Sequence, residues 1–370
     1  MLQMTRSSGR LALLAVAALL LAVAAPAAAG SFRWHPLPNM SMARGYSTAA
    51  VLADGDFLVI GGLVTSTRWT ATAERYDLAE RSWAPAGQMA TPRTWAEAIT
   101  LRNGKVLVAG GQTGSYAYTR LAETYDPATN AWSPAGELSV ARGDAQTVML
   151  RDGRVMVIGG ERSGTAQTAV DIYDPRSGTW SAAAPLGVGR WNFTATMLFG
   201  GKVLVAGGLR SGWQVTSSAE IYDPATDTWT PIPPMTGARH THAAVRLWNG
   251  KVLVMGTYWG ADPHSVEIYD PVSNTWTQRA PMASARAYLA AELLPNGQVL
   301  AIGGNDTQYA QRSTEIYNPW TDTWRYGGEM SSPRASLVSG RSGATVIVAG
   351  GVTGSYGARR TATADVFAPW

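Results

Sequence analysis

Seven arginines and seven acidic residues recur through the chain, and side chains of this kind can either pair with one another or bind a ligand. The arginines are Arg44, Arg93, Arg142, Arg190, Arg239, Arg286 and Arg334. The acids, each two residues before a tyrosine or phenylalanine, are Glu74, Glu123, Asp171, Glu220, Glu267, Glu315 and Asp365. Paired, they would form a buried structural ring; unpaired, the arginines would line a channel mouth that binds an anion. Because a ligand rarely needs seven equivalent residues, we predict structural pairing.

Three of the four histidines could contribute to a metal site. His240 and His242 alternate at the start of a predicted strand, so both rings could face one side, with Asp262 or His264 in the loop above them. The pattern is weak, and we predict that the protein has neither a metal nor another cofactor.

Sequence motifs for other catalytic centres are missing. The chain has no cysteine and contains no G-x-S-x-G, H-E-x-x-H or P-loop sequence. A pair of carboxylates could still act on a sugar. However, most acids either belong to the repeated positions or fall in predicted hairpin turns, so we assign no catalytic residue.

The elements that must position these residues follow from an internal repeat of 47 to 49 residues, marked by tryptophan. The repeated tryptophans are Trp34, Trp83, Trp132, Trp180, Trp229, Trp276 and Trp324. Within one repeat, 95–101 reads as a strand, Asn103-Gly104 as a two-residue hairpin turn and 105–109 as the next strand. A third strand ends at Tyr125, and a turn leads to a fourth. Four antiparallel strands repeated radially indicate a β-propeller.

The repeated motifs resemble the kelch repeat. A glycine pair is followed by acid-x-Tyr-Asp-Pro and then by tryptophan seven residues after the tyrosine, as in Gly110-Gly111, Glu123 to Pro127 and Trp132. The resemblance extends from Trp34 to Phe367 and implies a propeller, but kelch propellers include both binding proteins and enzymes. One of these enzymes, galactose oxidase, uses a copper centre with a linked tyrosine and cysteine, which this cysteine-free chain cannot build. Many kelch repeats also carry a histidine where His242 lies, which argues against a metal role.

The two ends of the repeat region predict how the ring closes. Trp34 has the fourth-strand pattern but is not preceded by three other strands, whereas the last repeat stops before its own fourth strand. We therefore predict seven four-stranded blades in an all-β fold, with 31–37 completing the last blade, because otherwise two strand edges would stay unpaired. The propeller is expected to occupy residues 30–370.

Function is expected where the repeats differ. The connections between blades and the loops after the glycine pairs should emerge on one face, whereas the opposite face carries similar Asp-Pro turns. Aromatic and arginine side chains in such loops are common anchors of binding surfaces. The candidates for this ligand-binding face are Trp69, Trp95, Tyr116, Trp191, Trp213, Tyr258, Trp259 and Arg210.

The first 29 residues predict export. Arg6 and Arg10 precede an apolar stretch, Pro26 interrupts it, and 27–29 supplies an A-x-A cleavage pattern. An uncleaved anchor is the alternative. Removing this signal peptide leaves 28 basic and 26 acidic residues (30 minus 2, against 26), which gives no electrostatic argument for nucleic acid or an anionic membrane. We expect a secreted or periplasmic monomer.

These observations support two hypotheses about function. The first is a non-catalytic module that binds a glycan or a protein on its aromatic face. The second is a carbohydrate-active enzyme, similar to the exported kelch epimerase that acts on sialic acid. A unique, desolvated acid or base at the channel mouth would favour the enzyme, and a mouth with only symmetric arginine–acid rings would favour the binder.

Overall fold

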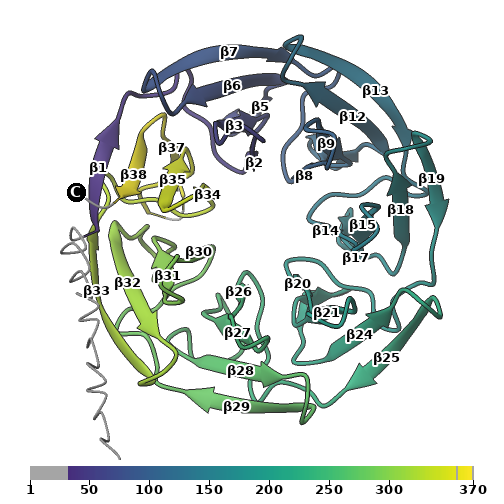
Figure 1. Ribbon diagram of the computed structural model, residues 1–370, viewed down its shortest axis with the longest axis vertical. Helices are drawn as coiled ribbons and strands as arrows, with labels where there is room; N and C mark the ends of the chain where they lie inside the picture. The colour runs from purple at the N-terminus through teal and green to yellow at the C-terminus, as the bar shows by residue number, and fades with distance from the viewer. Residues whose placement is uncertain (1–31, 356, 369–370) are drawn as a thin grey trace, which may run out of the picture.

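The computed structural model describes residues 32–355 and 357–368, which form a ring of seven blades around a central channel (Figure 1). The predicted signal peptide, residues 1–29, lies outside the described residues. Within the described part of the chain, no helix has the length and apolar character needed to cross a membrane. Each blade is a four-stranded antiparallel sheet, so the predicted propeller is confirmed.

The first strand of every blade lies next to the channel, and the second follows it after a tight turn. The first strands are β2 (Thr48–Val51), β8 (Glu97–Thr100), β14 (Gln146–Met149), β20 (Thr194–Met197), β26 (Ala243–Arg246), β30 (Ala290–Leu293) and β34 (Val338–Ser342). The second strands are β3 (Phe57–Ile60), β9 (Val106–Ala109), β15 (Val155–Ile158), β21 (Val203–Ala206), β27 (Val252–Met255), β31 (Val299–Ile302) and β35 (Thr345–Ala349). Buried on both faces, the second strands are runs of apolar residues.

The third and fourth strands form the outer part of each blade. The third strands are β6 (Thr72–Asp77), β12 (Leu121–Asp126), β18 (Val170–Asp174), β24 (Ala219–Asp223), β28 (Val266–Asp270), β32 (Ser313–Asn318) and β38 (Ala364–Ala368). The fourth strands are β7 (Ser82–Gln88), β13 (Ala131–Glu137), β19 (Thr179–Ala182), β25 (Thr228–Ile232), β29 (Thr275–Arg279), β33 (Thr323–Glu329) and β1 (Arg33–Leu37).

Five blades carry a short extra hairpin between their second and third strands. These hairpins are β4 (Leu63–Thr65) with β5 (Arg68–Trp69), β10 (Gln112–Gly114) with β11 (Ala117–Tyr118), β16 (Glu161–Arg162) with β17 (Thr165–Ala166), β22 (Leu209–Arg210) with β23 (Gln214–Val215), and β36 (Val352–Thr353) with β37 (Arg359–Arg360). Bridges such as Gly45 to Leu63 and Thr94 to Gln112 join the base of a hairpin to the segment that enters the same blade. The loops and the blade connections therefore share one face, which we call the loop face.

The core lies between neighbouring blades. Alternate residues of a second strand face opposite neighbours, so Leu58 packs toward Val106 of the next blade, whereas Val59 packs toward Ile347 of the last blade. The repeated tyrosine and tryptophan also contact each other, with ring centroids 5.2 Å apart for Tyr125 and Trp132. The structure thus explains these repeated aromatics as packing residues.

Closure of the ring depends on β1. It pairs antiparallel with β38, from Arg33 opposite Ala368 to Leu37 opposite Ala364. The Trp34 ring lies 5.2 Å from that of Phe367, and its Nε1 donates to Thr314 Oγ1 of the sixth blade at 3.0 Å. The strand β1 therefore completes the seventh blade and ties it to the sixth, as predicted.

Trp34→Ala is expected to lower the free energy of unfolding by about 3 kcal/mol, because it leaves a cavity at the closure and removes a hydrogen bond between blades. Chemical denaturation measures this change. The control is Trp320→Ala, since Trp320 is 63% exposed in an outer turn and its loss should cost less than about 1 kcal/mol. Equal, small effects of both substitutions would show that β1 is not needed for closure.

Candidate functional site

In every blade, a buried arginine holds the connection that leads into the blade. We call this arginine and its paired carboxylate the clamp. Each of the seven arginines is at most 1% exposed and forms an ion pair with the acid of the third strand in the blade that it enters. The distances between guanidinium nitrogen and carboxylate oxygen range from 2.5 Å for Arg239–Glu267 to 3.0 Å for Arg286–Glu315. Burial lowers the pKa of the guanidinium groups and the paired carboxylates oppose this shift, so the arginines remain charged.

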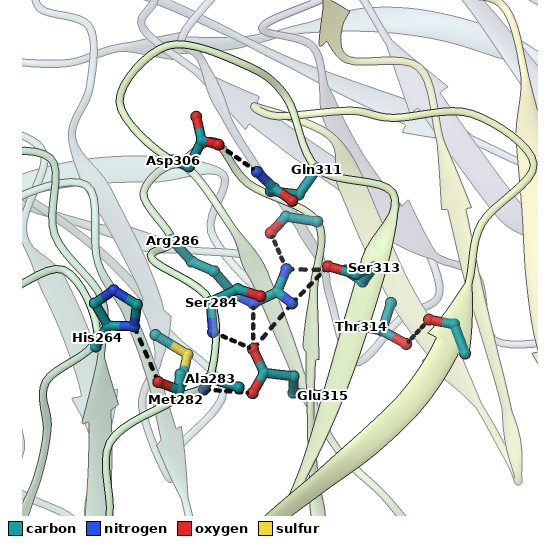
Figure 2. A network of polar contacts seen from close by, with 12 residues as sticks. His264, Met282, Ala283, Ser284, Arg286, Asp306, Gln311, Ser313, Thr314 and Glu315 are labelled. Atoms are coloured by element: carbon teal, nitrogen blue, oxygen red, sulfur yellow. Dashed lines mark hydrogen bonds and ion pairs between the residues drawn. The ribbon is translucent and has the colours of Figure 1, made fainter.

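Backbone groups complete each clamp, as Figure 2 shows for the sixth blade. Arg286 donates to Ser313 O at 2.9 Å and to Gly303 O at 2.7 Å, while Glu315 accepts from the N–H groups of Ala283 and Ser284. In every blade, the acid accepts from the backbone N–H three residues before the arginine. The connection, the second strand and the third strand are thereby held together. These arginines do not reach the channel mouth.

Two residues after each clamp arginine, the backbone adopts a left-handed conformation. The seven residues, here called the mouth ring, are Tyr46, Trp95, Asp144, Asn192, Thr241, Tyr288 and Ser336, with φ between 46° and 54°. Side chains other than glycine rarely adopt this conformation, and the strain is often kept at functional sites. Six residue types occupy seven equivalent positions, so packing symmetry does not explain their identity.

Hydrogen bonds link the mouth ring from blade to blade. The N–H of Trp95 donates to Tyr46 O at 3.2 Å, and that of Asp144 donates to Trp95 O at 3.0 Å. Thr241, Tyr288 and Ser336 donate in the same way to the ring residue before them, so five such links are present among the described residues. The backbone from which these side chains project is thus held at a defined place around the channel.

All seven residues of the mouth ring line one cavity of about 300 Å³ at the channel mouth. Below them, the start of the first strands adds Thr48, Glu97, Gln146 and Val338 to the wall. The Tyr46 and Trp95 rings lie 5.2 Å apart on one side, and Tyr288 lies on another blade, 5.8 Å from Tyr258. The cavity therefore combines aromatic faces with hydroxyl, amide and carboxyl groups.

Two unpaired carboxyl groups face this cavity. Burial raises the pKa of Glu97 to about 8, and the nearby Asp144 adds to this shift. Burial likewise raises the pKa of Asp144 to about 8, with a contribution from the charge of Glu161. Glu161 itself accepts a hydrogen bond from Tyr118 in the loop above. Both carboxyl groups of the cavity are therefore mainly protonated at neutral pH.

The other titratable groups of the cavity stay neutral near pH 7. Burial raises the pKa of the Tyr46 and Tyr288 hydroxyls. Burial, together with Arg239, lowers the pKa of His242 well below its ordinary value, so its imidazole is uncharged. His242 Nε2 lies 3.1 Å from Thr194 Oγ1, a hydrogen bond that holds its ring against the fourth blade. Glu97 and Asp144 thus dominate the protonation chemistry of the mouth.

The candidate loop residues are distributed over the loop face, and one of them, Trp95, lines the cavity. Tyr116, Trp213 and Trp259 are exposed. Trp69, Tyr258 and Arg210 lie in loops outside the cavity lining, Trp69 and Tyr258 half-buried and Arg210 exposed.

Trp191 differs from the expectation of an accessible anchor, because it is 2% exposed. The exposed Trp213 ring meets it edge-on at 5.5 Å. Its indole therefore packs beneath the loop instead of facing solvent.

The three histidine candidates do not form a metal site. His264 Nδ1 donates to Met282 O at 3.0 Å (Figure 2), and His240 is buried against the rings of Tyr258 and Trp259. Among residues 32–355 and 357–368, no group of three histidine, aspartate or glutamate side chains is arranged to hold a metal ion.

Sequence reasoning missed most of the cavity. Glu97 and Asp144 are neither clamp acids nor hairpin-turn residues, so they are exceptions to the expectation that most acids occupy those positions. The available signal was positional: each mouth-ring residue stands two places after a repeated arginine, yet its type varies.

Comparisons with known proteins agree with this architecture. A family model described as "Kelch motif" matches residues 98–139, 147–187, 190–236, 239–283 and 294–331, which together are more than half of the chain. No curated protein matches the sequence. Among solved structures, a fungal alcohol oxidase of the AA5 family in complex with copper is 18% identical, with a TM-score of 0.71 over 92% of this chain and 76% of that chain.

That likeness concerns the fold. Copper would need several nitrogen, oxygen or sulfur ligands gathered at one point. Among the described residues, no three histidine, aspartate or glutamate side chains form such a group, and the chain has no cysteine, so the likeness in fold does not extend to these copper ligands.

Arg142→Ala is expected to lower the free energy of unfolding by about 3 kcal/mol or more, because Asp171 then stays buried without its partner. The exposed pair Arg120–Glu137 provides the control, since Arg120→Ala should cost at most about 1 kcal/mol. Denaturant titrations give both values. If Arg142→Ala cost no more than Arg120→Ala, the clamp would not be structural.

The two cavity carboxyls predict a pH-dependent stability. Their pKa rises on folding, from 4.5 for Glu97 and 3.8 for Asp144 to about 8, so the folded state binds protons more tightly. The contribution of these two protonated groups to the stability of the fold is complete below pH 4 and is lost as the pH rises through 8. The free energy of unfolding should therefore fall more steeply from pH 5 to 9 in the wild type than in Glu97→Gln/Asp144→Asn. Equal slopes would contradict the shift.

Proposed function

This chain belongs to the kelch family of repeat proteins, and from that premise we propose that it is an exported module that binds a glycan at the mouth of its central channel. The observation that carries the proposal is the mouth ring: seven equivalent positions, held by one scaffold, present different side chains to one cavity. Structural residues repeat in this chain, whereas these do not.

The chemistry of the cavity suits a sugar. Aromatic rings such as Tyr46 and Trp95 can stack on the apolar face of a pyranose, and the Gln146 and Asn192 amides can exchange hydrogen bonds with its hydroxyls. A volume of about 300 Å³ is at the lower end of the range for small-molecule pockets. A protein partner would also need about 800 Å² of the surrounding loop face. The size of the cavity therefore supports a small ligand such as a short glycan.

A second candidate, a carbohydrate-active enzyme, is favoured by Glu97 and Asp144, because they are unique, desolvated acids at the channel mouth, the feature expected of such an enzyme. A carboxyl group with a pKa of about 8 is protonated at neutral pH and can act as a general acid, and its ionised form can act as a base. An epimerase or a glycosidase needs such groups. Product analysis by NMR of any glycan that binds would separate this candidate from simple binding.

A glycan array with the mature chain, followed by titration of the best ligand, tests the proposal. Trp95→Asn should weaken binding by about 1–3 kcal/mol, roughly 5- to 150-fold, because it removes an aromatic face. Asparagine tolerates the left-handed backbone, and Asn192 already occupies the equivalent position of the fourth blade, so folding should be kept.

The control is Thr226→Ala in an exposed turn of the opposite face, which should bind normally. The proposal fails if Trp95→Asn binds as tightly as the wild type while Thr226→Ala does not, or if no glycan on the array binds.

A further inference from the structure

The charge of the cavity is the opposite of what an arginine-lined mouth would give. No lysine or arginine is among the described residues that line it. The seven clamp arginines, which could have supplied positive charge, are all committed to buried carboxylates. Glu97 and Asp144 make no hydrogen bond or ion pair through their carboxyl groups with any residue described here. The cavity therefore contains two acids and no cation from the protein.

Three aromatic rings of the mouth ring line the same cavity as these acids. Tyr46 and Trp95 form one wall, and Tyr288 belongs to a blade on another side. The negative face of such rings attracts a positive charge, most strongly where water is excluded. Both the ring faces and the carboxylates would therefore attract an ammonium group in this cavity.

We propose that the ligand is an aminated sugar, whose protonated amino group lies between Glu97 and Asp144 against the mouth-ring aromatics. This inference rests on the proposed function and specifies its substrate class. A neutral sugar would offer both acids hydroxyl groups but no compensating charge, and an acidic sugar such as sialic acid would disfavour the ionised form of either acid. An ammonium group instead provides the partner that both carboxyl groups lack.

Binding of a cation must then be coupled to proton release. A carboxyl group isolated in a poorly solvated cavity stays protonated, and a neighbouring positive charge favours its ionised form. Because both groups have a pKa of about 8, the affinity for a cation should rise as the pH approaches that value. The affinity for a neutral sugar should change little over the same range.

The titratable and charged groups around Glu97 and Asp144 support the assignment of the pH dependence to these two residues. Glu161, bonded to Tyr118, lies above Asp144, and the guanidinium of Arg360 lies 5.7 Å over the Tyr46 ring outside the cavity lining. Tyr46, Tyr288 and His242 have pKa values displaced away from neutrality by burial. Between pH 6 and 8, ionisation in the mouth therefore belongs mainly to Glu97 and Asp144.

A matched set of sugars tests the inference: glucose, its 2-amino and 6-amino derivatives, and glucuronic acid, titrated by calorimetry or ligand-detected NMR. At pH 7.5, we expect at least one amino derivative to bind about tenfold more tightly than glucose, and glucuronic acid to bind most weakly. The affinity for the 6-amino derivative, whose amine stays protonated, should increase by up to about tenfold per unit from pH 6 to 8.

Substitutions test whether Glu97 and Asp144 cause the preference for amino derivatives. Glu97→Gln/Asp144→Asn should remove the preference for the amino derivatives while glucose still binds. The control is Glu292→Gln: Glu292 is another half-buried acid of a first strand with a raised pKa, but it is hydrogen-bonded to Ser339 at 2.6 Å and does not line the cavity. The Glu292→Gln variant should keep the wild-type preference for amino derivatives over glucose.

Each other outcome is decisive. If glucose binds as tightly as both amino derivatives, the inference is wrong and glycan binding stands. If an amino derivative binds and glucose shows no affinity at any concentration, a cation site exists but recognition of the sugar ring fails. If none of the four sugars binds, the inference is overturned, and the glycan array alone decides whether glycan binding stands.

Discussion

The buried arginine–carboxylate clamp is the interaction on which the rest of this propeller depends. Each clamp joins three segments of one blade: the incoming connection, the end of the second strand and the start of the third, as Arg286 and Glu315 do in the sixth blade. The charged groups are out of water and are stable there because the carboxylate and most of the guanidinium N–H groups find partners. Removal of one partner would leave the other charge buried alone, so the two residues of each of the seven pairs cannot change independently. This explains why an arginine and an acid recur at every repeat.

In each blade, the structural arginine and the residue that faces the cavity are only two positions apart in the sequence. Arg142 is buried in the scaffold, whereas Asp144, two residues later, has a left-handed backbone and faces the cavity. Because the clamp fixes the backbone, the side chain at the mouth-ring position can change without altering the blade. The hydrogen bonds between successive ring residues then transmit a common geometry around the channel. A symmetric scaffold can thereby carry an asymmetric site.

The sequence predicted the scaffold well because its constraints repeat. The periodic tryptophans, the turns and the incomplete first and last repeats led to seven blades closed by the strand that contains Trp34, as observed. The site was harder to predict. Glu97 and Asp144 belong to different blades, and their surroundings arise only when first strands distant in the sequence converge on the channel. Conversely, Trp191 reads as a loop aromatic, yet Trp213 from the same blade packs against it. The density of neighbours around a residue is a property of the closed ring and is not encoded by local pattern.

The central claim is that the seven mouth-ring positions act together as one ligand site. Hydrogen–deuterium exchange measured with and without saturating 6-amino-6-deoxyglucose tests it most directly, because five of the ring amides are hydrogen-bonded reporters of the mouth. The account predicts slower exchange on ligand addition in the peptides that contain these five amides, around residues 93–97, 142–146, 239–243, 286–290 and 334–338, with no change in the outer turns at 126–130 and 223–228. Protection confined to those turns or to the tips of the loop hairpins, with none in the mouth ring, would contradict it.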